Sequence, residues 1–134
     1  MAVALEMMRT HPLTRGDDEP LARGVEECVA CAQACTACAD ACLAEDDVAS
    51  LRSCIATTLD CADVCEATGR LLTRRTGADA TVTRAQLLAC IETCRQCAEE
   101  CEAHASHHEH CRVCAQACRR CEQACEEALA AVPA

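Results

Sequence analysis

The chain has 134 residues, a formal net charge of −10, and no phenylalanine, tyrosine or tryptophan. Its length fits one domain, and its acidic balance argues against nucleic acid or an anionic membrane as a partner. Leucine, isoleucine and valine total 21 residues, which is fewer than an ordinary hydrophobic core supplies. The chain is therefore either disordered or built around another core residue, and its 17 cysteines are the candidates.

Residues 1–16 are predicted to form an N-terminal arm, helical in part through Met7 and Met8. The arm lacks a basic opening and Glu6 interrupts its apolar stretch, so it makes a poor signal peptide. The sequence has no run of 18 apolar residues that predicts a membrane span. We therefore expect a cytoplasmic protein, a compartment in which thiols stay reduced.

Residues 17–134 are predicted to form a single helical domain. Short connections between similar helices predict an all-α fold, an antiparallel up-down-up-down four-helix bundle. The expected helices span roughly residues 18–44, 47–75, 83–105 and 106–131. Their expected start signals are a cap at Asp17 or Asp18 and capping boxes at Thr83 with Gln86 and at Ser106 with Glu109. Arg74 and Arg75 are expected in the last turn of the second helix.

The cysteines follow one another at alternating steps of three and four residues. This spacing places side chains on one face of an α-helix, so each predicted helix carries a stripe of thiols where a bundle normally carries leucine. Disordered segments have no reason to keep this rhythm, and the pattern therefore predicts a core lined by cysteine. The stripes are Cys28, Cys31, Cys35, Cys38 and Cys42; Cys54, Cys61 and Cys65; Cys90, Cys94, Cys97 and Cys101; and Cys111, Cys114, Cys118, Cys121 and Cys125.

The first and last helices read as copies, because residues 27–42 and 110–125 match at nine of sixteen positions. The second helix keeps the rhythm but has Thr58 and Thr68 where thiols are expected. A carboxylate beside its stripe, Asp60, is a candidate oxygen ligand, although a solvated side chain is the simpler interpretation.

The two ends of the predicted bundle differ. One end gathers His104, His107 and His108, any of which can point inward. His107 and His108 lie in the first turn of the last helix, where the helix dipole is expected to keep them neutral and able to bind metal. His110 is the weaker candidate, because it adjoins Cys111 but is expected to face elsewhere. The other end gathers aliphatic residues that would close it: Leu21, Val25, Leu71, Leu72, Leu87, Leu88, Leu129 and Val132.

Several chemistries use many cysteines. An odd count, the absence of an export signal and the poor geometry of neighbours on one helix oppose a disulfide framework. Structural zinc and iron–sulfur clusters need separate groups of four ligands, whereas continuous stripes supply a ladder. Cu(I) prefers thiolate, two thiolates suffice for one ion, and one thiolate can bridge two ions. About one monovalent ion per thiol would leave the core neutral, which predicts a capacity on the order of 17 ions.

The CxxCxxxCxxCxxxC stripes of the first and last helices, the shorter stripes between them and the histidine-rich turn resemble the four-helix-bundle copper storage proteins, in particular their cytosolic branch. The resemblance covers about residues 18–130. It implies a homotetramer of bundles, each filled with Cu(I) along its axis through one open end. All 17 cysteines would be ligands, with His104, His107 and His108 at the entrance.

The leading hypothesis is thus non-catalytic storage and detoxification of Cu(I), with delivery by a copper chaperone as one route. Met7 and Met8 would add thioether ligands if the arm crossed the open end, and ordinary packing is the alternative. Three other interpretations stay open: sequestration of zinc or another soft metal, a helical interaction module in which cysteine is only core filler, and a redox enzyme or sensor with one or two exposed thiols.

Overall fold

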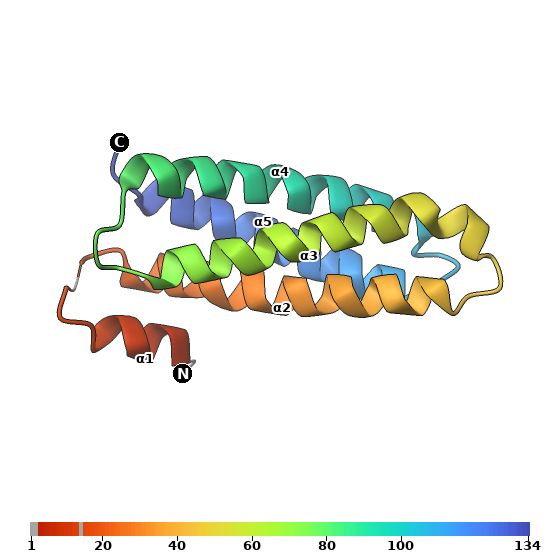
Figure 1. Ribbon diagram of the computed structural model, residues 1–134, viewed down its shortest axis with the longest axis horizontal. Helices are drawn as coiled ribbons and strands as arrows, with labels where there is room; N and C mark the ends of the chain where they lie inside the picture. Colours follow the sequence, from red (N-terminus) through yellow and green to blue (C-terminus); the bar gives the residue numbers. More distant parts are fainter. Residues whose placement is uncertain (1–2, 14) are drawn as a thin grey trace.

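The structure is a computed structural model that describes residues 3–13 and 15–134, and the elements in these ranges are all helical. The described elements are α1 (Val3–Arg9), α2 (Asp18–Leu43), the short 3₁₀-helix η1 (Val48–Leu51), α3 (Arg52–Thr73), α4 (Ala80–His104) and α5 (Glu109–Ala131). The four long helices lie side by side, and α1 lies along α2 (Figure 1). The predicted all-α class is confirmed.

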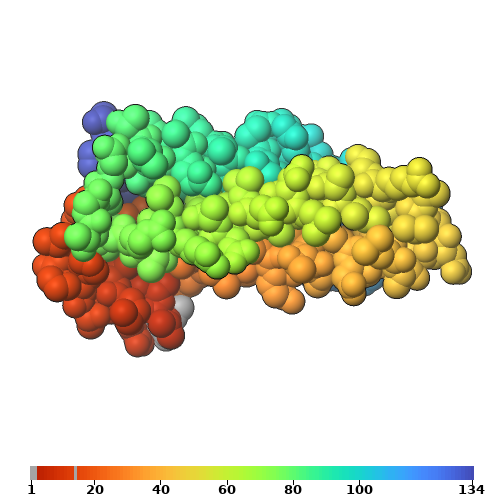
Figure 2. All heavy atoms as spheres, viewed as in Figure 1, coloured from red at the N-terminus to blue at the C-terminus, as the bar shows by residue number. Residues whose placement is uncertain are grey.

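The two ends of the molecule are formed by different connections. Residues 44–51 and 105–108 lie at one end, which we call the histidine end, and residues 15–17, 74–79 and 132–134 lie at the other, the aliphatic end (Figure 1). Figure 2 shows that the N-terminal segment, in red, widens the aliphatic end, whereas the opposite end is narrower. Helix α1 therefore does not reach the histidine end.

The N-terminus of α4 differs from the predicted capping box. The helix begins at Ala80 rather than near Thr83, because the carboxylate of Asp79 accepts hydrogen bonds from the backbone N–H groups of Thr81 (2.9 Å) and Val82 (3.1 Å). Gln86 instead donates from its side-chain amide to the buried hydroxyl of Thr68 at 2.9 Å. A tertiary hydrogen bond has replaced the local one.

The residues predicted to cap α2 and α5 also interact differently from the prediction. α5 begins at Glu109, not at Ser106, and the Glu109 carboxylate pairs with Arg112 one turn on. Asp17 precedes α2 at the cap position but accepts no hydrogen bond there from the helix with its side chain. Its carboxylate pairs with Arg75, which follows α3 instead of lying in its last turn.

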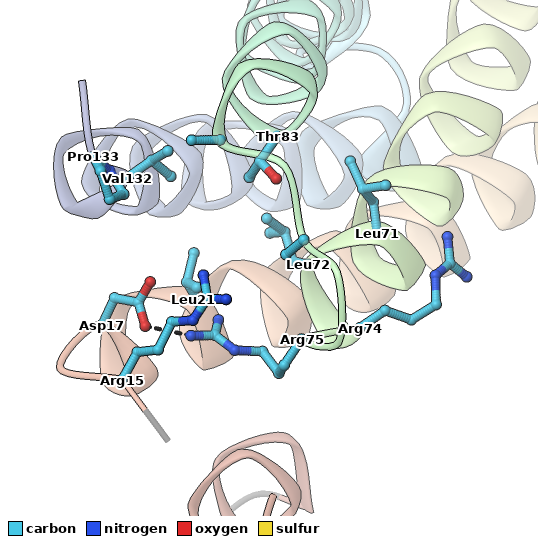
Figure 3. A pocket seen from close by; sticks show the side chains of 12 residues that line it. Arg15, Asp17, Leu21, Leu71, Leu72, Arg74, Arg75, Thr83, Val132 and Pro133 are labelled. Carbon is cyan, nitrogen blue, oxygen red and sulfur yellow. Dashed lines mark hydrogen bonds and ion pairs between the residues drawn. The ribbon is translucent and has the colours of Figure 1, made fainter. Parts of the chain in front are cut away.

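Aliphatic side chains and one ion pair close the aliphatic end (Figure 3). Leu21, Leu72 and Val132 line a cavity of about 70 Å³ that no cysteine reaches. Beside them the Arg75 side chain is only 4% exposed, paired with Asp17 and 3.9 Å from Asp18. Most of the aliphatic residues predicted to close this end are buried or half-buried, with one correction. Leu88 is 53% exposed, because it lies one residue past the inward-facing Leu87.

The buried ion pair gives a stability prediction. We expect Arg75→Ala to lower the free energy of unfolding of the metal-free protein by about 3–5 kcal/mol, since Asp17 keeps a largely covered charge without a partner. Urea denaturation under reducing conditions measures this. Arg74→Ala is the matched control, because Arg74 is exposed and points away from the pair (Figure 3), and its effect should stay within about 0.5 kcal/mol. Equal effects would contradict the assignment.

Cysteine is the main component of the core, as the spacing predicted. The buried cluster joins all 17 thiols to a few aliphatic side chains. Thr58 and Thr68 lie fully buried within it, and their hydroxyls donate back to carbonyls of their own helix. Met8 packs into the core near the aliphatic end while Met7 is 61% exposed. Since α1 lies at the aliphatic end, neither methionine lies at the histidine end, where it could add a thioether ligand.

Candidate metal centre

Every cysteine of the chain is a free, buried thiol. The Sγ–Sγ contacts range from 3.5 Å, between Cys65 and Cys94, to 4.0 Å, between Cys61 and Cys94, whereas a disulfide bond measures about 2.05 Å. These contacts join different helices as well as successive turns of one helix. The thiols therefore form one packed lattice along the axis of the molecule.

Cys35 of α2 illustrates the lattice. Its sulfur lies 3.8 Å from Cys31 and Cys97 and 3.7 Å from Cys114 and Cys118. One sulfur thus has neighbours on its own helix, on α4 and on α5. An ion bound beside Cys35 would tie three helices together.

The thiols also form compact groups of four whose sulfurs lie within 4.8 Å of one another. The sequence predicted a ladder without discrete fours. The structure contains compact fours, and most of them share members with another four. Cys31, Cys35, Cys118 and Cys121 each belong to at least two groups. The groups include Cys28, Cys90, Cys121, Cys125; Cys31, Cys65, Cys94, Cys121; Cys31, Cys35, Cys61, Cys118; Cys35, Cys97, Cys114, Cys118; and Cys38, Cys42, Cys54, Cys111. Since members are shared, the lattice favours ions that share sulfurs.

The group nearest the histidine end has a nitrogen beside it. His110, in the first turn of α5, places Nδ1 3.4 Å from Sγ of Cys38 and 3.7 Å from Sγ of Cys111. The expectation that His110 faces elsewhere is therefore wrong. Its ring reaches across to α2, and that contact depends on how α2 and α5 pack, which the spacing within one helix does not reveal.

Acidic residues of the turn after α2 hold two histidines. Glu45 Oε2 lies 2.8 Å from His110 Nε2 and 2.9 Å from His108 Nδ1, and Asp47 Oδ2 lies 2.9 Å from His108 Nε2. The hydrogen bond to Asp47, reinforced by both carboxylate charges, raises the pKa of His108. The carboxylates thus act in the opposite direction to the helix N-terminus, on which the prediction of a neutral His108 rested.

For the other two predicted histidines, no hydrogen bond to sulfur is found among the described residues. His104, in the last turn of α4, is partly buried, with Nε2 3.6 Å from Glu100 Oε1. His107 is exposed in the connection to α5. All three predicted histidines and His110 are therefore at one end, and among the described residues His110 is the histidine within hydrogen-bond distance of sulfur. Asp60 is exposed.

Two of the thiols at this end, Cys42 and Cys111, hold their protons tightly. Burial raises the pKa of Cys111 to about 12, and repulsion from Cys54 and Cys42 adds to the effect. Burial likewise raises the pKa of Cys42, with further repulsion from Cys54. A metal ion that binds these sulfurs as thiolates must therefore displace protons.

An all-helical chain with a continuous lattice of buried free thiols defines a thiolate-lined metal-binding protein. The sequence profile of the copper storage protein family matches residues 17–130. The chain belongs to this family.

Solved structures of relatives agree with this assignment. The copper storage protein Ccsp from Streptomyces lividans, loaded with 10 copper equivalents, is 59% identical over 96% of this chain and 98% of its own, with a TM-score of 0.93. A structure described as a cytosolic copper storage protein from the same organism, with five coppers, is 64% identical over 85% of this chain and 95% of its own, with a TM-score of 0.84. A variant of Ccsp in which a histidine is replaced by alanine is 62% identical over 86% of this chain and 96% of its own, with a TM-score of 0.84.

Two further results are negative. No curated protein sequence matches the chain at a significant level. Within the described part of the chain, no helix combines the length and the apolar character needed to cross a bilayer.

Proposed function

We propose that this protein stores and detoxifies Cu(I) in the cytosol without catalysing a reaction. The ions lie within an antiparallel up-down-up-down four-helix bundle and are bound by the thiolates of all 17 cysteines, at about one ion per cysteine. Membership of the copper storage protein family supports this proposal, as do copper-loaded structures of relatives that are about 60% identical.

The observation that carries the proposal is the overlap of the four-thiol groups. A divalent ion that requires four thiolates of its own would use the 17 sulfurs for about four ions. Cu(I) is soft and accepts bridging thiolates, so the same sulfurs serve many ions. Equal numbers of monovalent cations and thiolates also leave the buried core near neutrality, and charge buried without compensation is costly.

The histidine end is the entrance in this proposal. His104, His107 and His108 form its rim, and His110 is the nitrogen ligand closest to the first thiols, because its Nδ1 already lies beside Cys38 and Cys111. The aliphatic end contributes no ligand, since leucine, valine and the Arg75–Asp17 pair close it.

Residues 1–16 act as an arm and residues 17–134 as the copper-binding domain in this scheme. A homotetramer of such bundles follows from the family resemblance. The partly exposed Leu59 and the half-buried Ile55 and Ile91 lie off the thiol stripes, and their positions suit a contact between subunits. A copper chaperone is the proposed donor.

Titration of the reduced, metal-free protein with Cu(I) against a competing chelator tests the function. We expect saturation well above ten ions per chain, approaching one per cysteine. Saturation at one to four ions refutes storage and favours zinc-like sites of four thiolates. No uptake, with helical content intact, indicates an interaction module in which cysteine only fills the core. A redox sensor would instead show one or two fast-reacting thiols before copper is added.

A further inference from the structure

Glu45 occupies a central position at the histidine end. It lies in the turn after α2, three residues beyond Cys42, and its backbone N–H donates to the Cys42 carbonyl at 3.2 Å. Its side chain is one-third exposed, and a single oxygen, Oε2, meets both His110 and His108. The turn that follows the first thiol stripe is thereby joined to the N-terminus of α5.

The contact with Glu45 decides which nitrogen of His110 faces the thiols as a ligand. A carboxylate oxygen can only accept a hydrogen bond, so Nε2 of His110 carries the hydrogen and donates it across 2.8 Å. In the neutral ring the lone pair then belongs to Nδ1, which lies 3.4 Å from the sulfur of Cys38. Outer-shell carboxylates fix tautomer and ring orientation in this way at metal sites.

His108 supports the same oxygen from the other side. Its Nδ1 and Nε2 face Glu45 and Asp47, so both nitrogens donate and neither is free to bind metal in this arrangement. Its ring stacks on that of His110, with centroids 5.5 Å apart and planes inclined by 25°. The carboxylate of Glu45 is thus held in place by a second residue that does not contact sulfur.

We propose that Glu45 is a positioning residue for copper uptake, which presents Nδ1 of His110 to the thiols of Cys38 and Cys111. This role rests on the proposed storage function and adds a residue outside the thiol lattice to it. Without Glu45 the ring is free to rotate or to change tautomer, so the first ions meet a less organised site. The deeper thiols are unaffected, because none of the described contacts joins them to this turn.

The test compares the rate of uptake with the total capacity. Transfer of Cu(I) from a coloured chelator to the metal-free protein is followed by stopped flow, and a titration gives the endpoint. We expect Glu45→Ala to load its first ions about ten-fold more slowly, at the lower end of the range found for outer-shell partners of metal ligands, with an unchanged endpoint. Glu45→Gln keeps an oxygen that accepts from His110 and should restore most of the rate.

The matched control is Asp46→Ala, which removes the same charge from the same turn. Asp46 is exposed, and no side-chain contact to either histidine is found for it among the described residues. It should load at the wild-type rate, whereas equal slowing by both alanine variants would mean that only the charge of the entrance matters and would overturn the proposal. Circular dichroism checks that each variant is folded.

A double mutant separates positioning from other roles. If Glu45 acts through His110, then Glu45→Ala adds no further slowing in a His110→Ala background. Additive slowing overturns the assignment. Failure of the storage function itself has a different signature, since the wild-type protein would then take up only a few ions whatever residue stands at position 45.

Discussion

Filling the core with Cu(I) is expected to raise the unfolding temperature of the protein by tens of degrees. The metal-free core has no aromatic side chain and few aliphatic ones, and thiols bury less apolar surface than leucine does. Each bound ion, in contrast, joins sulfurs from different helices, as at Cys35, which meets thiols of α4 and α5. An ion that binds only the folded chain stabilises it by about 4 kcal/mol when present at a thousand times its dissociation constant.

The size of the shift follows from the size of the chain. For a domain of this length, about 1 kcal/mol corresponds to roughly 4 °C, so the first tightly bound ion is expected to add on the order of 15 °C. Several ions should place unfolding near or above about 90 °C. Far-ultraviolet circular dichroism during heating, with zero, five and fifteen equivalents of Cu(I), measures the effect.

The control for this experiment is reversal. Removal of copper by a strong Cu(I) chelator under reducing conditions should return the melting temperature to that of the metal-free protein. A melting temperature that stays constant at all loadings would mean that the ions bind outside the core, because surface ions do not tie the helices together.

The core and the two ends of the molecule were predictable from the sequence. A spacing of three and four residues places side chains on one helix face, whichever elements pack against that face. All 17 cysteines, from the first at Cys28 to the last at Cys125, are buried accordingly. The long helices also begin and end within a few residues of the predicted bounds, except at the start of α3, where η1 occupies the first turn. Periodic patterns of this kind depend only on local geometry.

Contacts between distant segments were not predictable. Thr83 and Asp17 are residue types that often cap helices. In the structure, however, Asp79 caps α4, and the carboxylate of Asp17 forms an ion pair with Arg75. His110 was ranked below its neighbours because it lies one residue from Cys111, about 100° away around a helix. Its Nδ1 nevertheless faces Cys38 of α2. Glu45 lies 65 residues from His110 along the chain, so their pairing depends on the fold.

Copper binding is expected to weaken steeply in acid. Burial raises the pKa of Cys42 and raises that of Cys111 to about 12, so these thiols are protonated at neutral pH and each must lose its proton when an ion binds. For every proton released per ion, the apparent affinity falls about ten-fold per pH unit. For an ion whose binding releases one proton, we therefore expect the apparent affinity to fall up to about 100-fold between pH 7.5 and pH 5.5.

At Cys42, Cys111 and His108, the sign of this effect is opposite to that of their contribution to the stability of the metal-free fold. A thiol whose pKa is raised on folding stabilises the folded chain below its ordinary value and loses that contribution as the pH rises toward about 12. The raised pKa of His108 likewise stabilises the fold in acid, with the benefit lost as the pH rises through its folded value. Acid should thus release copper from a protein that stays folded. Competition titrations from pH 5.5 to 7.5, with circular dichroism at each pH, separate release from unfolding, and an affinity that does not change with pH would show that the ions bind groups other than protonated thiols.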